Sequence, residues 1–260
     1  MNSLQLKKDF FNKIDTNLSD LVRVISYPCL SINECIKRIE EMQDLGITDI
    51  IFEGITQIGR TPILGKGSVS IVLKVRIGNK RYALKIRRMD ANRKTMLREA
   101  TVHRMVNAIG IGPILFRFSE NLIIMEFIDG LSIIDWIRQR YLSRNRVLNI
   151  VTSILKQCFI LDMANINHGE LNNLNYHIII SYSDRVSIID FESTSLNKKK
   201  SNNVTSASQS LFINGIISDH INNMLNLLSK DNIIEKLRAY KRNQNATNFD
   251  SLIQTLSNGV

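Results

Sequence analysis

The stretch from residue 64 to residue 85 constrains the fold more than any other part of the chain. Two glycines, Gly65 and Gly67, stand directly before a run of alternating side chains. Four aliphatic side chains of this run are expected on one face, Val69, Ile71, Leu73 and Val75, and Val72 is expected on the other. A Gly-Asn pair at 78–79 then marks a turn, and a second short run ends on Lys85. This pattern predicts a β-hairpin with a glycine-rich first bend, followed by a strand that carries one inward lysine. Glycines let backbone N–H groups approach an anion closely, and the lysine adds a fixed positive charge, so the stretch favours a nucleotide polyphosphate.

Composition limits the remaining possibilities. The 260 residues suffice for one large domain or two smaller ones, and the net charge of +10 permits phosphate-bearing partners such as ATP, RNA or acidic proteins. Three cysteines are an odd number without metal-binding spacing, which predicts reduced, buried thiols rather than a disulfide framework. The N-terminus has no apolar signal region, and no apolar run is long enough to span a bilayer. We therefore expect a cytoplasmic protein with no membrane partner.

Residues 1–60 read as a helical extension. Loosely helical apolar spacing runs through residues 4–18, and Ser31 and Glu34 form a capping box before an apolar stripe that ends at Gly46. A short strand is expected at 47–52 and a turn-rich bridge at 54–62. The extension is predicted to pack on residues 61–127, and the alternative is a separate recognition module.

Downstream of Lys85, a helical pattern begins at Asn92 and places Glu99 near its middle. Two strands are expected at 114–118 and 122–125, and the chain breaks at 126–130. Further helices are expected at 132–140 and 145–164. Taken alone, Glu99 would be an exposed intrahelical partner of a neighbouring basic residue.

The second informative stretch begins at His168-Gly169-Glu170-Leu171 and reaches Asn175 before an apolar run at 178–180. A polar turn leads from this run to a second one that ends in Asp190-Phe191-Glu192. The pattern is a loop, a strand, a tight turn and a strand that ends in aspartate.

Together these motifs resemble those of protein kinases. Gly65-x-Gly67-x-x-Ser70-x-Val72 and Ala83-Leu84-Lys85 resemble the glycine-rich loop and strand lysine, with Ser70 where a third glycine usually stands. His168–Leu171 is similar to the loop of atypical kinases of the RIO group and of the small kinase of the tRNA-modifying KEOPS complex. Asp190-Phe191-Glu192 is similar to choline and aminoglycoside kinases and to archaeal predicted Ser/Thr kinases, and the last group resembles the chain over about 31–212.

The resemblance implies an α+β, two-lobed kinase-like fold. Residues 61–127 would form an N-lobe with an antiparallel sheet and one long helix, and residues 128–260 a mainly helical, minimal C-lobe. ATP and Mg²⁺ are the implied cofactors. Lys85 would hold the α/β-phosphates with Glu99, Glu170 would stand at the catalytic-base position, and Asp190 and Asn175 would hold metal, with Asn172 or Asn173 as substitutes in another loop register. The implied ATP-binding residues are Leu64, Gly65, Lys66, Gly67, Ser68, Val72, Ala83, Lys85, Glu99, Met125, Glu126 and Ile128.

Departures from the kinase pattern leave several activities open. Glu170 replaces an aspartate and adds a methylene, and a misplacement near 1 Å can lower a rate by about 10²-fold, which keeps an ATP-binding pseudokinase among the candidate functions. The segment after Asp190 has no Ala-Pro-Glu. A helix that Asn203 or Thr205 would cap is expected through 211–216, and then only two helices, at 216–228 and 233–240, and a polar tail remain. This small lobe favours a specialised protein substrate, which includes the protein itself. A small-molecule kinase and a nucleotide-switched protein on RNA or a ribonucleoprotein are also compatible with the sequence.

Overall fold

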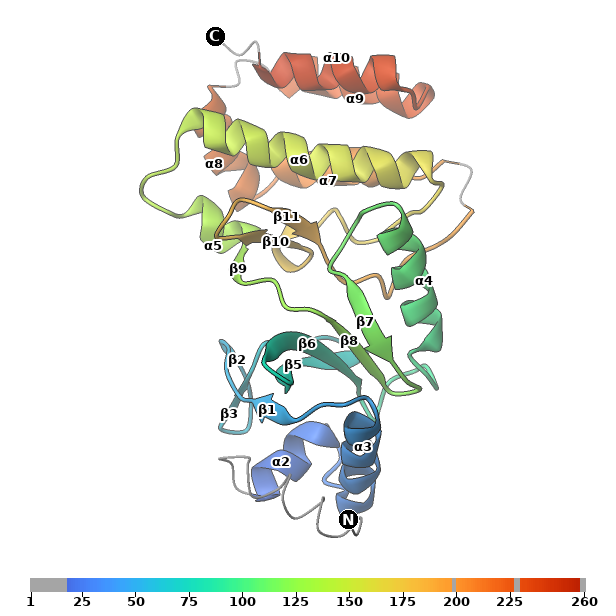
Figure 1. Ribbon diagram of the computed structural model, residues 1–260. Coiled ribbons are helices and arrows are strands. Elements are labelled where there is room, and N and C mark those ends of the chain that lie inside the picture. Colours follow the sequence, from blue (N-terminus) through green and yellow to red (C-terminus); the bar gives the residue numbers. More distant parts are fainter. Residues whose placement is uncertain (1–17, 198–199, 227–229, 258–260) are drawn as a thin grey trace. The chain divides into compact units, whose positions relative to one another are not determined.

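The computed structural model describes residues 18–197, 200–226 and 230–257, and it divides into two compact units. The first contains the described residues up to Arg104 together with Pro113–Phe127, and the second contains Met105–Gly112 and the described residues from Ile128 onward. The helical spacing expected upstream of Leu18 and two of the three lysines at 198–200 lie outside the described residues. The expected mixture of helices with antiparallel sheets is confirmed (Figure 1).

The first unit is built on a six-stranded antiparallel sheet with the order β1-β5-β6-β8-β7, in which β4 also pairs with β5. Its strands are β1 (Asp49–Ile51), β4 (Gly65–Lys66), β5 (Ser70–Ile77), β6 (Lys80–Arg87), β7 (Leu115–Phe118) and β8 (Leu122–Glu126). The predicted hairpin is confirmed, because β5 pairs with β6 from Ser70 opposite Arg87 to Ile77 opposite Lys80. The alternation places Ile71, Leu73 and Val75 in one core cluster, each at most 1% exposed. Val69, expected on the same face, precedes β5 and packs in a different cluster with Met96 and Ile123.

Two N-terminal helices cover the apolar face of this sheet. They are α2 (Leu18–Ile25) and α3 (Ile32–Asp44), and their buried side chains share one core cluster with those of β5, β6 and β8. Half of the expected capping box at the start of α3 is confirmed, since the Ser31 hydroxyl accepts a hydrogen bond from the Glu34 N–H at 3.3 Å. The reciprocal half is wrong, because the Glu34 carboxylate accepts from Lys37 and the Ser31 N–H donates to the Ser26 hydroxyl. The region expected as a turn-rich bridge is instead a short hairpin of β2 (Thr56–Ile58) and β3 (Thr61–Ile63).

Helix α4 (Leu97–Ala108) begins later than the sequence pattern indicated. The prediction placed its start at Asn92, but the chain between Ala91 and Met96 is taken up by contacts with other segments. Arg87 Nη1 donates to the Arg93 carbonyl, and the Met96 N–H donates to the Glu120 carbonyl at 2.8 Å. These long-range bonds use backbone groups that a longer helix would have needed internally.

The second unit combines a three-stranded antiparallel sheet with a set of helices. The sheet has the order β11-β10-β9 and consists of β9 (Gly130–Ser132), β10 (Ile178–Ser181) and β11 (Val186–Ile188). The helices are α5 (Ile133–Ile137), α6 (Arg144–Met163), the 3₁₀ turn η1 (Leu174–Tyr176), α7 (Asn203–Ser208), the π-helical turn η2 (Gln209–Ile213), α8 (Ile216–Leu225), α9 (Lys230–Arg242) and α10 (Ala246–Ser257). One face of α6 is an apolar core stripe, and the members that the sequence spacing predicts from Val151 to Leu161 are buried. Leu148, the expected first member, is only partly buried, and Val147 takes its place in the core.

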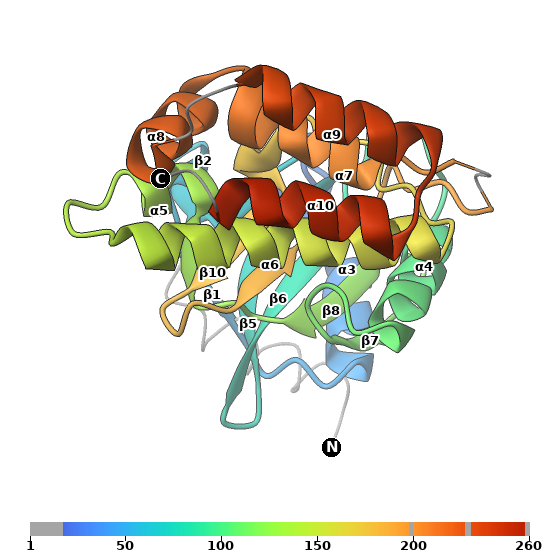
Figure 2. The ribbon, with the colours of Figure 1, turned by 90° about the horizontal axis from the view of Figure 1, so that it is seen from above.

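The polar tail expected after α9 is wrong, because the chain there forms α10. Figure 2 shows α10 running beside α6 and α9. Phe249 of α10 stacks on Phe159 of α6 with ring centroids 4.4 Å apart, and Leu252 and Leu256 are buried. Apolar residues at helical spacing, rather than overall polarity, therefore decide the structure of this segment.

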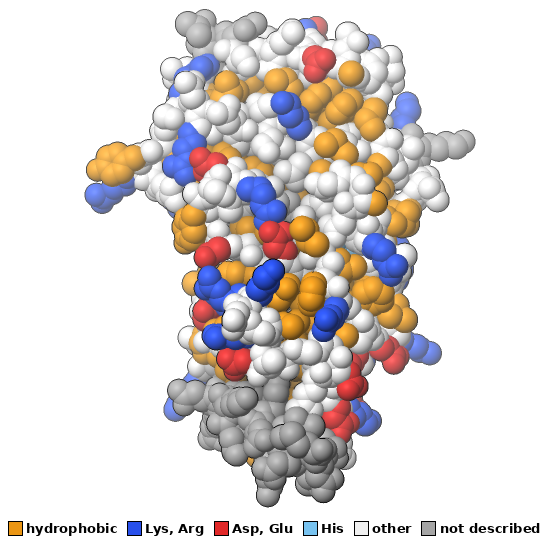
Figure 3. Space-filling model, viewed as in Figure 1, with side chains coloured by type: hydrophobic (Ala, Val, Ile, Leu, Met, Phe, Trp, Pro, Cys, Tyr) orange, Lys and Arg blue, Asp and Glu red, His pale blue; other side chains and the backbone are white. Residues whose placement is uncertain are grey.

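Surface features agree only partly with the composition-based expectations. On the face in Figure 3, lysine and arginine side chains are scattered among apolar and acidic ones rather than gathered in one patch. Within the described ranges, no helix has both the length and the apolar character that crossing a membrane requires. Cys35 and Cys158 are buried free thiols as expected, but Cys29 is exposed, because it follows Pro28 in the connection between α2 and α3.

Candidate functional site

Strand register brings several sequence-predicted residues to one face of the first unit's sheet. Val72 lies opposite Lys85, and Ala83 lies opposite both Lys74 and Met125. Directly paired residues of antiparallel strands project to the same face, so these five side chains share it. It is the face opposite to the one that α2 and α3 cover.

Lys85 and Glu99 form a buried ion pair on this face. The Lys85 ammonium donates to Glu99 Oε1 at 2.6 Å, and the two side chains are only 5% and 4% exposed. Helix α4 brings Glu99 to this position because Met96 and Ala100 pack with Ile123 of β8 in a second core cluster. Glu99 is therefore not the exposed intrahelical partner that it would be in isolation, and a buried lysine is held in one position with its charge compensated.

The glycine-rich bend forms the tight turn that the sequence indicated. Leu64 N–H donates to the Val72 carbonyl at 3.1 Å, and Gly67 N–H donates to the Ser70 carbonyl at 2.8 Å, with Lys66 and Ser68 completing the bend. A Cβ added at Gly65 would meet no described atom within 4 Å, and Gly65 does not have a positive φ. Neither backbone strain nor packing within the described chain thus requires glycine there, whereas close approach of a phosphate group would.

Lys74 is a charged residue of this face that the sequence reasoning missed. It is 4% exposed, pairs with Glu53 at 2.5 Å, and places its ammonium 4.0 Å from the centroid of the Phe127 ring. Its position two residues after Val72 in a strand of fixed alternation could have revealed that it faces the same side. Glu126, at the end of β8, lies opposite Tyr82, and its N–H donates to the Ile114 carbonyl.

In the second unit, the predicted catalytic loop is held by its histidines. His168 is fully buried, and its Nε2 donates to the Ile189 carbonyl at 3.0 Å, so this histidine braces the loop. Glu170 is partly exposed, and its Oε2 lies 3.6 Å from Nε2 of His177, a neighbour that the sequence did not indicate. The His177 carbonyl accepts from Ile189 N–H at 2.9 Å, which fixes this loop against the residue before Asp190.

Asp190 has a backbone conformation that is uncommon for a residue other than glycine. Its φ is +68°, in the left-handed region that L-residues adopt at an energetic cost. Phe191 after it is buried, with its ring against Gly112, where an added Cβ would lie 2.8 Å from the nearest ring atom. Glu192 is 8% exposed. The Asp-Phe-Glu segment is therefore anchored by its second residue while its first is held in a strained turn.

A buried polar cluster supports this loop and was not foreseen. Asp162 of α6 accepts hydrogen bonds from the side chain and N–H of Asn203, from Val204 N–H and from the Tyr240 hydroxyl. Asn203 Oδ1 in turn accepts from His168 N–H at 2.9 Å. Burial raises the pKa of the Asp162 carboxyl, and burial beside Asp162 also raises the pKa of Tyr240. The cluster thus ties α6, α7 and α9 to the start of the loop.

Asn175 supplies the observation that bears on metal binding. Its Oδ1 is buried, and among the described residues it has no hydrogen-bond partner. An orphan amide oxygen of this kind fits a hard, oxygen-preferring cation such as Mg²⁺. Within the described chain, no three His, Cys, Asp or Glu side chains gather as a metal site.

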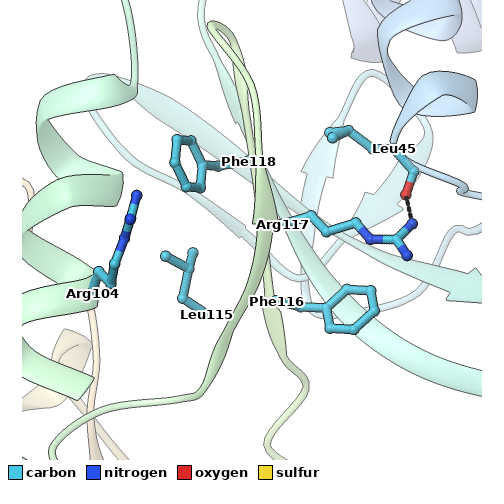
Figure 4. Close-up of a pocket in the computed structure, with 6 residues that line it drawn as sticks. All are labelled: Leu45, Arg104, Leu115, Phe116, Arg117 and Phe118. Carbon is cyan, nitrogen blue, oxygen red and sulfur yellow. Dashed lines mark hydrogen bonds between the residues drawn. The ribbon is translucent and has the colours of Figure 1, made fainter. Parts of the chain in front are cut away.

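A depression of about 440 Å³ along β7 does not contain the predicted residues. Figure 4 shows Arg104, Leu115 and Phe118 on one side of the strand and Phe116, Arg117 and Leu45 on the other. Arg117 donates to the Leu45 carbonyl at 2.7 Å, at the C-terminus of α3, and its guanidinium lies over the Phe116 ring. Arg117 thus joins β7 to the end of α3, while Arg104 of α4 lies over the Phe118 ring on the other side of the strand, so we assign both arginines a structural role.

Comparison with known proteins gives one informative similarity. No protein-family model matches the chain. A curated protein, EKC/KEOPS complex subunit BUD32 of Enterocytozoon bieneusi, is 26% identical to it over 134 residues. The alignment covers 48% of this chain and 64% of that protein, which is less than two thirds of its length. The chain therefore has a distant similarity to this BUD32, which supports the expected resemblance to the KEOPS-complex group to that extent.

Proposed function

We propose that the chain is an ATP- and Mg²⁺-dependent phosphotransferase, an atypical Ser/Thr protein kinase that acts on a specialised protein substrate or on itself. The observation that carries this proposal is the buried Lys85–Glu99 pair at 2.6 Å, on the sheet face that also bears Val72, Ala83 and Met125. A compensated, buried lysine beside a glycine-rich bend is suited to hold a nucleotide's phosphates. The similarity to BUD32 supports the same function.

Each predicted residue has a role in this proposal. Residues 61–127 would be the N-lobe, with the bend from Leu64 to Ser68 and the Lys85–Glu99 pair on the phosphates. Met125 and Glu126 of this lobe, and Ile128 just after it, would contact the adenine base. Residues 128–260 would be the C-lobe, and residues 1–60 an extension of the N-lobe. Asp190 and Asn175 would hold Mg²⁺, which when bound neutralises charge on the β- and γ-phosphates.

Glu170 would accept the proton of the acceptor hydroxyl. The hydroxyl oxygen would then bond to the γ-phosphorus while the bond between this phosphorus and the oxygen of the leaving ADP breaks. His177, 3.6 Å away, stands beside this carboxylate. We also propose that the chain has RNA or a ribonucleoprotein among its partners and works in an assembly like the KEOPS complex. The support is that the curated protein named above is a subunit of that complex.

The test is transfer of labelled γ-phosphate by the wild type, Lys85→Ala and Asp190→Ala, with casein, the chain itself and a panel of amino-alcohols and aminoglycosides as acceptors. We expect phosphoprotein from the wild type and loss of signal in both variants. Equal signal from all three proteins would refute the proposal. Labelled metabolite without phosphoprotein would favour a small-molecule kinase, the alternative that Asp190-Phe191-Glu192 suggests. ATP binding without transfer to any acceptor would favour a pseudokinase.

A further inference from the structure

The connection between α2 and α3 is anchored to the segment that follows β6. Met89 N–H donates to the Tyr27 carbonyl at 2.9 Å. Arg38 of α3 is only 2% exposed, and it donates to the Ile25 carbonyl at 2.8 Å and lies 3.1 Å from the Met89 sulfur. The backbone of Tyr27 is therefore held by Val24 of α2 and by Met89, and the buried Arg38 of α3 contacts both the end of α2 and Met89.

From Tyr27, the contacts continue directly to the glycine-rich bend. The Arg88 guanidinium lies over the Tyr27 ring, 5.0 Å from its centroid, and Arg88 Nη1 donates to the Gly67 carbonyl at 2.7 Å. The Lys66 ammonium lies 5.7 Å from the same ring centroid. Asp90 holds the other side of the Arg88 guanidinium with two hydrogen bonds, at 2.8 and 2.7 Å. The Tyr27 ring thus contacts two cations, Lys66 of the bend itself and Arg88, which donates a hydrogen bond to the bend.

A bend with two glycines has high conformational freedom, so its affinity for an anion depends on how far it is ordered beforehand. A charge-assisted hydrogen bond to Gly67 supplies this order, and the ring of Tyr27 holds the guanidinium that donates it. We propose that Tyr27 and Arg88 are positioning residues, through which docking of residues 18–45 sets the affinity of the glycine-rich bend for a nucleotide. This inference rests on the proposed function, since it takes the bend as the nucleotide's phosphate contact.

Binding of Mg²⁺·ATP, measured by isothermal titration calorimetry, tests the proposal. Removal of the ring in Tyr27→Ala should weaken binding by about 3- to 10-fold, the range expected for cation–π contacts of this kind, and Arg88→Ala should weaken it at least as much. Tyr27→Phe keeps the ring and should restore the affinity to within about twofold of the wild type. Phe116→Ala is the matched control, because it removes an aromatic ring of the same unit at the far edge of the sheet, and it should leave the affinity unchanged.

Thermodynamic coupling also requires the reverse effect, which the wild type alone can show. Mg²⁺·ATP should slow amide hydrogen exchange both in the bend at 64–68 and in a peptide that covers 22–31, and Phe116→Ala should retain this protection. If Tyr27 had only a structural role, Mg²⁺·ATP would not protect the 22–31 peptide. Wild-type affinity in Tyr27→Ala would overturn the inference and leave the proposed function standing. If Tyr27→Ala does not fold, an unprotected 22–31 peptide in the wild type would overturn it. A wild type that binds no Mg²⁺·ATP would overturn both.

Discussion

Removal of one partner of the Lys85–Glu99 pair should destabilise the first unit strongly. Both side chains are almost fully enclosed and 2.6 Å apart, and Arg93 Nη1 lies 3.7 Å from the other oxygen of Glu99. Glu99→Ala would leave the Lys85 ammonium buried without this carboxylate and would deprive Arg93 of it as well. Breaking a buried pair in this way costs about 3–5 kcal/mol.

Replacement of both partners by apolar side chains should have a much smaller effect. Lys85→Met combined with Glu99→Leu removes both charges and keeps most of the volume, and such exchanges are often neutral or stabilising by about 1–4 kcal/mol. The double variant should therefore be more stable than Glu99→Ala, although it should bind no nucleotide. This contrast separates the electrostatic contribution from the packing contribution.

The assay is urea denaturation followed by two signals. Far-UV circular dichroism reports both units, whereas the single tryptophan, Trp136, lies in the second unit. With a cost of about 3–5 kcal/mol and a urea slope of about 1–3 kcal/mol/M, the dichroism midpoint of Glu99→Ala should fall by about 1–5 M. A shift equivalent to less than about 1 kcal/mol, or a double variant as unstable as Glu99→Ala, would refute the assignment of a buried, compensated pair.

Three further variants test other parts of the structure. Asn203→Ala removes the hydrogen bonds to Asp162 and to the His168 N–H, and it should lower the unfolding free energy of the second unit by about 2–4 kcal/mol in a Trp136 fluorescence melt; wild-type stability would contradict the cluster. Burial lowers the pKa of His103, so the unfolded chain binds more protons at this residue than the folded chain does. The unfolding free energy from urea melts should therefore fall as the pH drops from 7.5 to 5. His103→Gln, which keeps a donor for the Pro113 carbonyl, should make this pH dependence weaker. Gly112 has a φ of +80° and lies against the Phe191 ring. Gly112→Ala should therefore lower the unfolding free energy by about 1–3 kcal/mol, seen as a lower melting temperature, and an unchanged melting temperature would show that this ring moves freely.

Local chemistry made part of the structure predictable. A hairpin needs only a turn signal and a period of two, so β5 and β6 could be read from neighbouring residues, and the same holds for the Ser31 cap. The proximity of Lys85 and Glu99 came from the family resemblance instead, since their separation of 14 residues has no local signature.

The missed features depend on residues that are distant in sequence. Asp162 looks like any polar residue on a helix, and its partners Asn203 and Tyr240 are 41 and 78 residues away. Lys74 reads as a surface charge until Glu53 and Phe127 are seen to enclose it. Overall polarity hid α10, whose burial is decided by a few residues such as Phe249.

Covalent labelling of Lys85 tests the central claim most directly. An acyl-phosphate derivative of ATP delivers its acyl group to a lysine amine beside the bound phosphates, and mass spectrometry identifies the labelled peptide. We expect Lys85 to be the dominant labelled lysine, Mg²⁺·ATP to suppress its labelling, and Asp190→Ala to weaken that suppression. Labelling of Lys85 that is absent, or that Mg²⁺·ATP leaves unchanged while other lysines react, would contradict the claim that this lysine holds a nucleotide's phosphates.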